Sequence, residues 1–550
     1  MNLGTMFNAY PDSIGYSLDK IVEFLSQDDL KNAFKSFYIL PTVFDADIDR
    51  GFSIISYDLC DKYASKQDLK NLNKNDIDLM FDFILNHLSI QSPQFKDILE
   101  NGDNSKYRDF FIDWNKFWEN KGEMCEDGYI KPYPDQFSLN NLRKKSYPIL
   151  TVNFPDGKRV PYWNTFYQKI TYPKIDSATL KELINSNSCD FEKLANEINN
   201  AIQNGLKPTE IDFNENDIDA KPIIQYLQSK EQYLGQMDLN FSNPEVWKWY
   251  EEVIKQLADY GATLIRLDAF SRLHKAPARV NFVNEPETWD ILEKLKQMAK
   301  KYNVEVLPEI HSAYCDKYYQ KLTNLGCITY DYFLPTLIID ALDNKDSKYL
   351  YVWAKEIIEN NIKVVNMLGC HDGIPMRDIR GLLPEKRVDS MIERLIKRGG
   401  HKKIVHGVKD EIYQMDMTYY QALGLDNKKM ELARVIQIFM PGKPQVWYMD
   451  LLAEPNDEEV LLKNPTTDTR EVNRKSYSMD EVKVLLDKTI VKKQIELLRL
   501  RNTHPAFSKD AIVKVSKPND STLTISWSCN LKSISLFVNF NDYSYSIVED

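Results

Sequence analysis

The feature that most constrains the fold is a series of short apolar runs, rich in β-branched and aromatic residues, that alternate with helix-like segments. Runs that are apolar throughout are typical of strands buried on both faces of a parallel sheet. The intervening amphipathic segments at 244–260 and 286–302 have the length of crossover helices. Together they predict an α/β protein built on a (β/α)8 TIM barrel. The expected strands lie near 4–9 and at 37–40, 78–84, 263–268, 305–307, 327–330, 363–368 and 435–439.

Two segments are too long to be ordinary connections in such a barrel. Residues 88–235 are predicted to form an inserted domain B, with an extra helical and acidic insert at about 173–230, and residues 372–430 a second inserted domain. Alternating runs within 496–550 predict a C-terminal antiparallel β domain. The catalytic barrel itself is expected from residues 1–87, 236–371 and 431–495.

The composition of the chain argues against some classes of binding partner. The chain has 81 acidic and 70 basic residues and a net charge of −11, which argues against binding to nucleic acid or to an anionic membrane. It contains neither a signal-peptide pattern nor a run of about 18 apolar residues, so we expect no export and no membrane span. Its seven scattered cysteines include no Cys-x-x-Cys pair. We therefore expect free thiols in a reducing cytoplasm and no metal site.

Polar side chains follow several predicted strands at the point where each strand ends. In a TIM barrel, the carboxyl ends of the strands carry the chemistry. Asp268, Glu309 and Asp372 each have a structural alternative as an ion pair, a helix cap or a turn residue. Three acids that converge on one point are harder to explain structurally, because ionised carboxylates are costly to crowd.

Three converging carboxyl groups suit glycosyl transfer with retention of configuration. Two carboxyls about 5–5.5 Å apart would supply a nucleophile and an acid, and the third would stabilise positive charge on the sugar. Crowding is expected to keep the acid protonated near neutral pH. His87 and His371 are interpreted as hydrogen-bonding partners of sugar hydroxyls, with a purely structural histidine as the alternative.

Four ordered segments resemble the motifs of glycoside hydrolase family 13, the α-amylase family. They are residues 82–87, which read Asp-Phe-Ile-Leu-Asn-His, and residues 261–270, 307–311 and 366–372. Within that family the chain resembles the sucrose phosphorylase group, a resemblance that covers nearly the whole chain. It implies a barrel with two inserted domains and a C-terminal β domain, and no metal or organic cofactor. The segments that carry it include Ala9-Tyr10-Pro11-Asp12-Ser13-Ile14-Gly15, Asp49-Arg50-Gly51-Phe52 and His371-Asp372-Gly373-Ile374.

The resemblance also implies a role for individual residues. Asp268 would be the nucleophile, Glu309 the general acid/base and Asp372 the transition-state stabiliser. Arg266, two residues before Asp268 and on the same face of its strand, would hold the nucleophile ionised. The other residues implied in substrate binding are Asp49, His87, His371 and Arg474 around the glucosyl hydroxyls, Phe52 and Phe166 as an apolar platform, Gln236 toward the acceptor, and Arg272, His311, Tyr413 and Gln414.

The reaction implied is that of a retaining α-glucoside phosphorylase. Sucrose and inorganic phosphate would give α-glucose 1-phosphate and fructose through a β-glucosyl-enzyme. The expected partners are therefore an α-glucoside substrate and phosphate, and the chain would be a monomer or a homodimer. A hydrolase, a transglucosidase and a non-catalytic family member are the alternatives.

A further alternative keeps this chemistry and takes an anionic substrate, sucrose 6′-phosphate or glucosylglycerate. It rests on positive charge expected near the acceptor, from Arg272, Lys275 and a basic, acceptor-site loop. A solvated basic face is the structural alternative for the loop, and a salt bridge to an acid of the inserted domain is the alternative for Arg272. The loop reads His401-Lys402-Lys403, with His406 and Lys409 following before Tyr413.

Overall fold

Eight parallel strands form a nearly closed barrel at the centre of the molecule, in the order β14-β13-β5-β2-β1-β20-β16-β15. The computed structural model describes residues 2–137, 146–184, 189–213, 218–405, 411–464 and 466–550 of the 550-residue chain. Most strand residues are buried, as expected for a sheet covered by helices outside and filled with side chains inside. The strands are β1 (Met6–Ala9), β2 (Ser36–Ile39), β5 (Asp78–Ile84), β13 (Ala262–Asp268), β14 (Glu305–Pro308), β15 (Thr329–Asp331), β16 (Val364–Met367) and β20 (Lys443–Trp447).

The predicted strand at 435–439 is wrong. These residues end helix α15 (Asn427–Phe439), and the eighth strand is β20. A short apolar run does not distinguish a strand from a buried helix. Helix α15 is buried along nearly its whole length because it packs between the barrel and the C-terminal helix α19 (Thr489–Thr503), so no amphipathic period marks it.

The helices that flank the barrel follow the predicted alternation. Helix α8 (Pro244–Asp259) begins at Asn243, whose side chain accepts a hydrogen bond from the Glu245 N–H, and it bears out the segment predicted at 244–260. Helix α9 (Glu287–Lys300) bears out the segment at 286–302. Other flanking helices are α2 (Lys66–Lys74), α11 (Leu334–Asn344), α12 (Lys348–Glu359) and α19.

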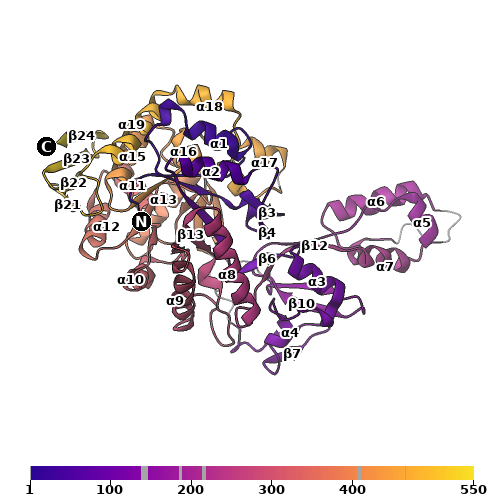
Figure 1. Cartoon of the computed structure of the whole chain (residues 1–550). Helices are drawn as coiled ribbons and strands as arrows, with labels where there is room; N and C mark the ends of the chain where they lie inside the picture. The colour runs from indigo at the N-terminus through magenta and orange to yellow at the C-terminus, as the bar shows by residue number, and fades with distance from the viewer. Residues whose placement is uncertain (1, 138–145, 185–188, 214–217, 406–410, 465) are drawn as a thin grey trace.

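The first long excursion from the barrel ends in a separate group of helices, α5 (Ser177–Leu183), α6 (Phe191–Gln203) and α7 (Lys221–Ser229). Figure 1 shows these three helices projecting from the body of the molecule. A two-stranded antiparallel ribbon joins them to it, in which β11 (Gln168–Thr171) pairs with β12 (Gln232–Asp238). The insert has its own apolar core, formed by Ile175, Leu180, Ile184, Leu194, Ala195, Ile198, Phe213, Ile223 and Leu227.

The second excursion carries a three-stranded sheet, and the chain ends in a four-stranded antiparallel sheet. The first sheet has the order β17 (Ile374–Pro375), β19 (Glu411–Asp416), β18 (His401–Val405). The last contains β21 (Ile512–Ser516), β22 (Thr522–Cys529), β23 (Lys532–Asn539) and β24 (Ser544–Glu549). Helix α19 runs across position 495, and the exact domain boundaries remain predictions.

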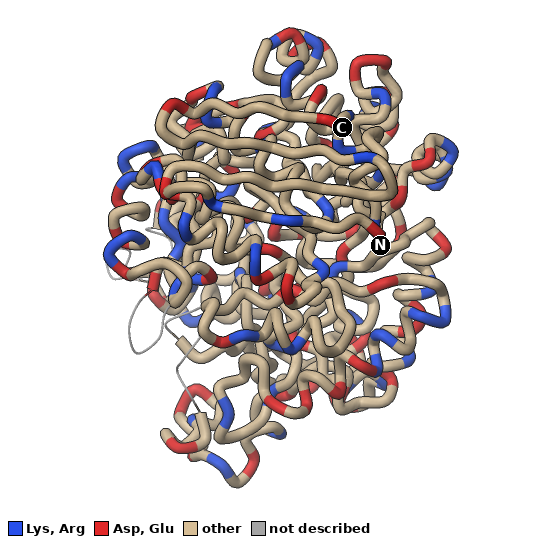
Figure 2. Tube along the Cα trace, turned by 90° about the vertical axis from the view of Figure 1, so that its left-hand side faces the viewer, with Lys and Arg blue, Asp and Glu red and all other residues tan. Residues whose placement is uncertain are grey.

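The C-terminal sheet is anchored to the barrel by polar as well as apolar contacts. Trp527 Nε1 donates to the Phe439 carbonyl at 2.7 Å, and the Arg501 guanidinium lies 4.5 Å from the Trp527 ring. Figure 2 shows acidic and basic residues interspersed over this side of the molecule, without a field of one sign. None of the described helices has the length and apolarity needed to cross a bilayer.

Candidate active site

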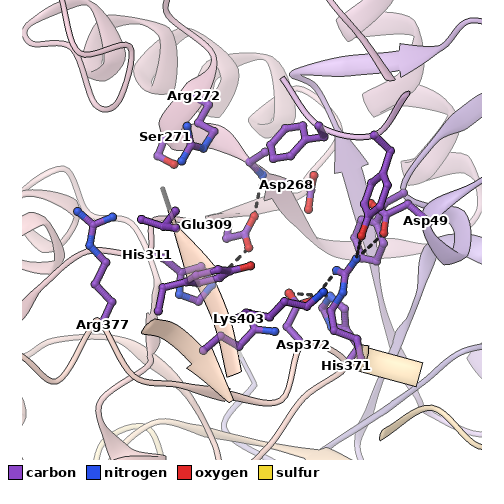
Figure 3. A pocket seen from close by; sticks show the side chains of 18 of the residues that line it. Asp49, Asp268, Ser271, Arg272, Glu309, His311, His371, Asp372, Arg377 and Lys403 are labelled. Carbon is purple, nitrogen blue, oxygen red and sulfur yellow. Dashed lines mark hydrogen bonds and ion pairs between the residues drawn. The ribbon is translucent and has the colours of Figure 1, made fainter. Parts of the chain in front are cut away.

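A cavity of about 410 Å³ lies at the carboxyl ends of the barrel strands and is bordered by both excursions. Figure 3 shows acidic and basic side chains converging on it from opposite sides. Most of the residues predicted from the sequence line this cavity. They are Asp49, Phe52, His87, Phe166, Asp268, Arg272, Glu309, His311, His371, Asp372, Tyr413 and Gln414.

Asp268 and Glu309 are held by one arginine. Arg266 Nη1 lies 2.9 Å from Asp268 Oδ1, and its Nη2 lies 2.7 Å from Glu309 Oε1. The same arginine contacts the fully buried Asp82 at 2.5 Å. Ala269, in the left-handed region at φ 50°, donates its N–H to Glu309 Oε2 at 2.7 Å. This turn directly after β13 fixes the second carboxyl beside the first.

Protonation is divided unequally between these two acids. Burial and the Glu309 carboxylate raise the pKa of Asp268 well above its ordinary value, against the effect of Arg266. Burial acts in the same direction on Glu309, but Arg266 and His311 outweigh it and lower the pKa of Glu309 to about 2. These two directions are opposite to the expectation that crowding keeps the acid Glu309 protonated, because the carboxyl group with the raised pKa is that of Asp268.

The third acid, Asp372, faces a different set of partners. Its Oδ1 lies 3.0 Å from Arg470 Nη1 and 3.4 Å from Arg474 Nη2, and its Oδ2 lies 3.3 Å from His371 Nε2. Burial opposes ionisation, but His371 and the two guanidinium groups outweigh it and hold the pKa of Asp372 well below its usual range. Asp372 is thus a fixed negative charge.

Polar and aromatic groups border the same half of the cavity. Asp49 pairs with Arg470 at 2.7 Å, and His87 Nε2 lies 2.9 Å from the Phe52 carbonyl. Burial lowers the pKa of His87, which leaves it neutral near pH 7. The Phe52 ring stacks on His371 with centroids 5.1 Å apart, and Phe166 lies 5.1 Å from His87. This half of the cavity offers hydroxyl partners beside apolar surfaces, which suits a neutral sugar ring.

Three predicted residues lie behind the cavity wall instead of lining it. Arg266 is buried beneath the two acids. Gln236 is fully buried and donates to Asp49 Oδ2 at 3.1 Å. Arg474 donates to the His371 carbonyl at 2.9 Å and so supports the segment that carries Asp372. All three contact residues that line the cavity, so they support its wall from behind.

Sequence reasoning missed several residues that line the cavity, foremost Arg470. It lies four residues before Arg474 in the segment Arg470-Glu471-Val472-Asn473-Arg474, within the short helix η9 (Thr469–Asn473), and it bridges Asp49 and Asp372. The second arginine of this five-residue segment was the available signal. The others come from segments without a recognisable pattern and are Tyr167, Gln168, Ala269, Ser271, Phe282, Arg377, Asp378, Ile404 and Val405.

The opposite half of the cavity carries cationic groups. The guanidinium carbons of Arg272 and Arg377 lie 5.7 Å and 5.8 Å from the centroid of one ring, Phe282. Arg272 and Arg377 give this half the positive charge that the sequence predicts near Arg272. Lys403 on β18 also lines the cavity, but on the side of Asp372 (Figure 3), where it pairs at 2.8 Å with Asp468, the carboxylate that also contacts Arg470.

Part of the predicted positive charge lies elsewhere. Lys275 is buried away from the cavity, where it pairs with Asp238 at 2.7 Å because burying an ammonium group requires a counter-charge. His401 pairs with Glu458 at 3.0 Å, and Lys402 is exposed. His406 and Lys409 lie outside the described residues. Within the described part of the chain, no group of three or more His, Cys, Asp or Glu side chains is arranged to hold a metal ion.

The chain is similar to proteins of known activity over nearly its whole length. Residues 30–140 match the family model described as "Alpha amylase, catalytic domain". A sucrose 6(F)-phosphate phosphorylase of Ilumatobacter coccineus is 41% identical, over 95% of this chain and 91% of that protein. A sucrose phosphorylase of Streptococcus mutans is 29% identical, over 95% and 92%.

A solved structure agrees with these relatives. The crystal structure of sucrose 6F-phosphate phosphorylase from Thermoanaerobacter thermosaccharolyticum matches with a TM-score of 0.81 at 28% identity, and covers 100% of this chain and 96% of that one. The barrel, the three strand-end acids and the extent of these matches agree with one another. The chain therefore belongs to the sucrose phosphorylase group of glycoside hydrolase family 13, the α-amylase family.

Proposed function

We propose that this protein is a retaining phosphorylase of anionic α-glucosides, with sucrose 6′-phosphate as substrate and α-glucose 1-phosphate and fructose 6-phosphate as products. The observation that carries the proposal is the two-sided cavity. Its inner half joins three acids to neutral hydroxyl partners, and its outer half presents Arg272 and Arg377 beside Phe282. A glucosyl group would occupy the inner half and a phosphorylated leaving group the outer half.

In the first step, Asp268 would attack the anomeric carbon of the glucosyl group. A bond forms between a carboxylate oxygen of Asp268 and that carbon, and the glycosidic bond breaks while Glu309 gives its proton to the departing oxygen. For this step the proton of the pair must be on Glu309, and Asp268 must be ionised. Arg266 contacts both carboxyls, so it keeps an ionised partner in either state.

In the second step, an oxygen of phosphate would attack the same carbon. The ester bond to Asp268 breaks, the Asp268 carboxylate is restored, and the phosphate proton passes to Glu309. Two inversions leave the product in the α configuration. Asp372, ionised and fixed by Arg470 and Arg474, would stabilise the positive charge that develops on the sugar ring in both steps.

Support for an anionic leaving group comes from the cation pair and from the relatives. Guanidinium groups bind phosphate oxygens with paired hydrogen bonds, and Phe282 lies beside both Arg272 and Arg377. The Ilumatobacter coccineus relative is named a sucrose 6(F)-phosphate phosphorylase. The sequence alone ranked unmodified sucrose first. The cationic outer half of the cavity is the reason to prefer the phosphorylated substrate.

The test is a direct comparison of substrates. Purified protein is incubated with sucrose, sucrose 6′-phosphate or glucosylglycerate, with and without phosphate, and the first-formed sugar phosphate is followed by NMR. We expect α-glucose 1-phosphate, formed fastest from sucrose 6′-phosphate and only when phosphate is present. Faster turnover of sucrose would return the neutral substrate to first place, glucose as the main product would indicate a hydrolase, and β-glucose 1-phosphate would reject the double displacement.

A further inference from the structure

The histidine next to the proposed acid/base is held between two carboxylates. His311 Nδ1 lies 3.2 Å from Asp378 Oδ2, and His311 Nε2 lies 3.5 Å from Glu309 Oε1. The imidazole ring stacks on Tyr332 with centroids 3.9 Å apart. Asp378 is itself fixed, because its Oδ1 accepts the Ser312 N–H at 3.1 Å. The ring therefore has little freedom to turn away from either acid.

When Glu309 and Asp378 are both ionised, as they are once Glu309 has given up its proton, this geometry favours a proton on both ring nitrogens. A neutral imidazole has one N–H and one bare nitrogen, and a bare nitrogen would face a carboxylate oxygen in either tautomer. The imidazolium form donates to both. In agreement, Asp378 and Glu309 outweigh the effect of burial and raise the pKa of His311 to about 10. Among the other groups around this ring, Arg266 lies beyond Glu309, and Arg377 borders the same cavity.

We propose that Asp378 is a positioning residue that keeps His311 in the imidazolium form, and that His311 thereby favours phosphate over water as the glucosyl acceptor. The inference rests on the proposed phosphorylase function and deepens it. His311 borders the cavity beside Glu309, where the leaving group departs and the next acceptor enters. At 3.5 Å, its contact with Glu309 is longer than an ordinary hydrogen bond, so the Nε2–H can also donate to an oxygen of incoming phosphate while the ring stays in place.

The positive charge of His311 affects phosphate more than it affects water as an acceptor. Phosphate is an anion, and an imidazolium donor strengthens its hydrogen bond. Water is neutral and gains far less. A cation at this point therefore raises the share of glucosyl-enzyme that reacts with phosphate, without speeding the first step.

The substitution Asp378→Asn separates the charge from the hydrogen bond. The amide oxygen of Asn still accepts the Ser312 N–H, which turns its NH2 group toward His311 Nδ1. The ring then becomes neutral, with Nδ1 as an acceptor and the proton on Nε2. Imidazolium exists below the pKa of the ring and is lost above it. In Asp378→Asn that pKa falls toward the ordinary value of about 6.5, whereas the wild type stays cationic across the neutral range.

The experiment uses α-glucosyl fluoride, whose leaving group needs no proton from Glu309. The initial burst of fluoride measures the first step, and the ratio of glucose 1-phosphate to glucose measures the choice of acceptor. The ratio is recorded against phosphate concentration from pH 6 to 9. In Asp378→Asn at pH 8 we expect the phosphate concentration that gives equal amounts of both products to rise about tenfold or more, with fluoride release changed less than about threefold. The shift should be smaller at pH 6, where the ring is again protonated.

Two further variants make the result decisive. His311→Gln keeps a donor without a charge and should show the raised phosphate requirement at every pH. Asp331→Asn makes the same chemical change at another buried strand-end acid that does not border the cavity, and should leave the ratio unchanged. If the wild type forms no glucose 1-phosphate, the proposed function fails. If it does, and both Asp378→Asn and His311→Gln share its product ratio, the role of Asp378 and His311 is overturned.

Discussion

Asp268 and Glu309 share one arginine, yet the roles proposed for them, nucleophile and general acid/base, differ. Only the nucleophile is needed for every glucosyl donor, whereas the acid is needed when the leaving group must be protonated. Their common contact with Arg266 means that loss of either carboxyl leaves the other still paired. Isosteric amides should therefore preserve the fold and expose the difference in role.

We predict that Asp268→Asn and Glu309→Gln each lower turnover of the natural glucoside by at least about a thousandfold. With α-glucosyl fluoride, Glu309→Gln should still release fluoride in a burst, and Asp268→Asn should not. Stopped-flow fluoride detection distinguishes the two. A wild-type rate in either variant with the natural glucoside would remove that residue from its role.

Arg272 allows a sharper test of the leaving group. Its guanidinium borders the outer half of the cavity beside Phe282, away from the glucosyl-binding half. Arg272→Ala should raise KM for sucrose 6′-phosphate about 10- to 100-fold, since hydrogen bonds to charged groups contribute about 1.5–3 kcal/mol. KM for sucrose should change little.

Lys402→Ala provides the control, because it also removes a positive charge, but Lys402 lies in the basic loop, is exposed and does not border the cavity. It should alter neither KM. Equal losses on both substrates in Arg272→Ala would mean that the arginine only supports the cavity wall.

The residues found from the sequence share one property: they stand at strand ends or in contiguous motifs. Asp268 ends β13, Glu309 directly follows β14, and Asp372 lies in the short segment after β16, so the carboxyl ends of the barrel strands bring the three acids together. Arg377 and Phe282 come from irregular segments whose path depends on packing, and no local pattern marks them. The sequence also does not show which charged residues are buried. Lys275 could have faced the substrate, but in the structure it is buried and paired with Asp238.

At the scale of elements, helix α15 and strand β20 show that the hydrophobic pattern alone does not distinguish a buried helix from a buried strand. Both are short, apolar and buried, and only length and the cap at Asp426 mark the first as a helix. Seven of the eight predicted strands are confirmed because amphipathic helices separate them and define their limits. The eighth prediction fell on the buried C-terminal half of α15, whose apolar run resembles a strand, and Pro441 and Gly442 separate that helix from β20.

The helices α5, α6 and α7 form an element group with its own core, which predicts independent stability. Ile198 is fully buried within that core. Ile198→Ala should destabilise the insert by about 2–5 kcal/mol. Hydrogen exchange should then speed up in α5, α6 and α7, with the barrel strands and fluoride release unchanged. Ile396→Ala, the same change at an exposed position on α13 (Glu385–Lys397), should have no such effect. Loosening of the barrel by Ile198→Ala would show that the two cores are coupled.

At the scale of the whole molecule, the barrel and the C-terminal sheet share one continuous core. Trp527 is buried at their junction and donates to the last residue of α15. Trp527→Ala should lower the free energy of unfolding of the main cooperative transition by about 3–5 kcal/mol, measured in denaturant.

Phe537→Ala, on the exposed face of the same sheet, should cost far less. A Trp527 variant that loses only the sheet, with the barrel transition unmoved, would show that the C-terminal sheet unfolds by itself. We therefore expect opposite behaviour from the two elements. A substitution in the insert, which has a separate core, should loosen the insert alone, whereas one in the C-terminal sheet, which shares the barrel core, should destabilise the whole molecule.

The ribbon formed by β11 and β12 allows the chain to gain or lose residues at one place without a change in the barrel. Thr171 and Gln232 are paired neighbours, so the chain leaves for the insert and returns at almost one point. Joining two adjacent strand ends by a short turn needs no rearrangement of the sheet, and loop-closure entropy changes by only about 0.6 kcal/mol for each doubling of loop length. The insert is therefore an interchangeable appendage: a hairpin turn, an affinity tag or a fluorescent domain with neighbouring termini can take its place while the barrel keeps its architecture.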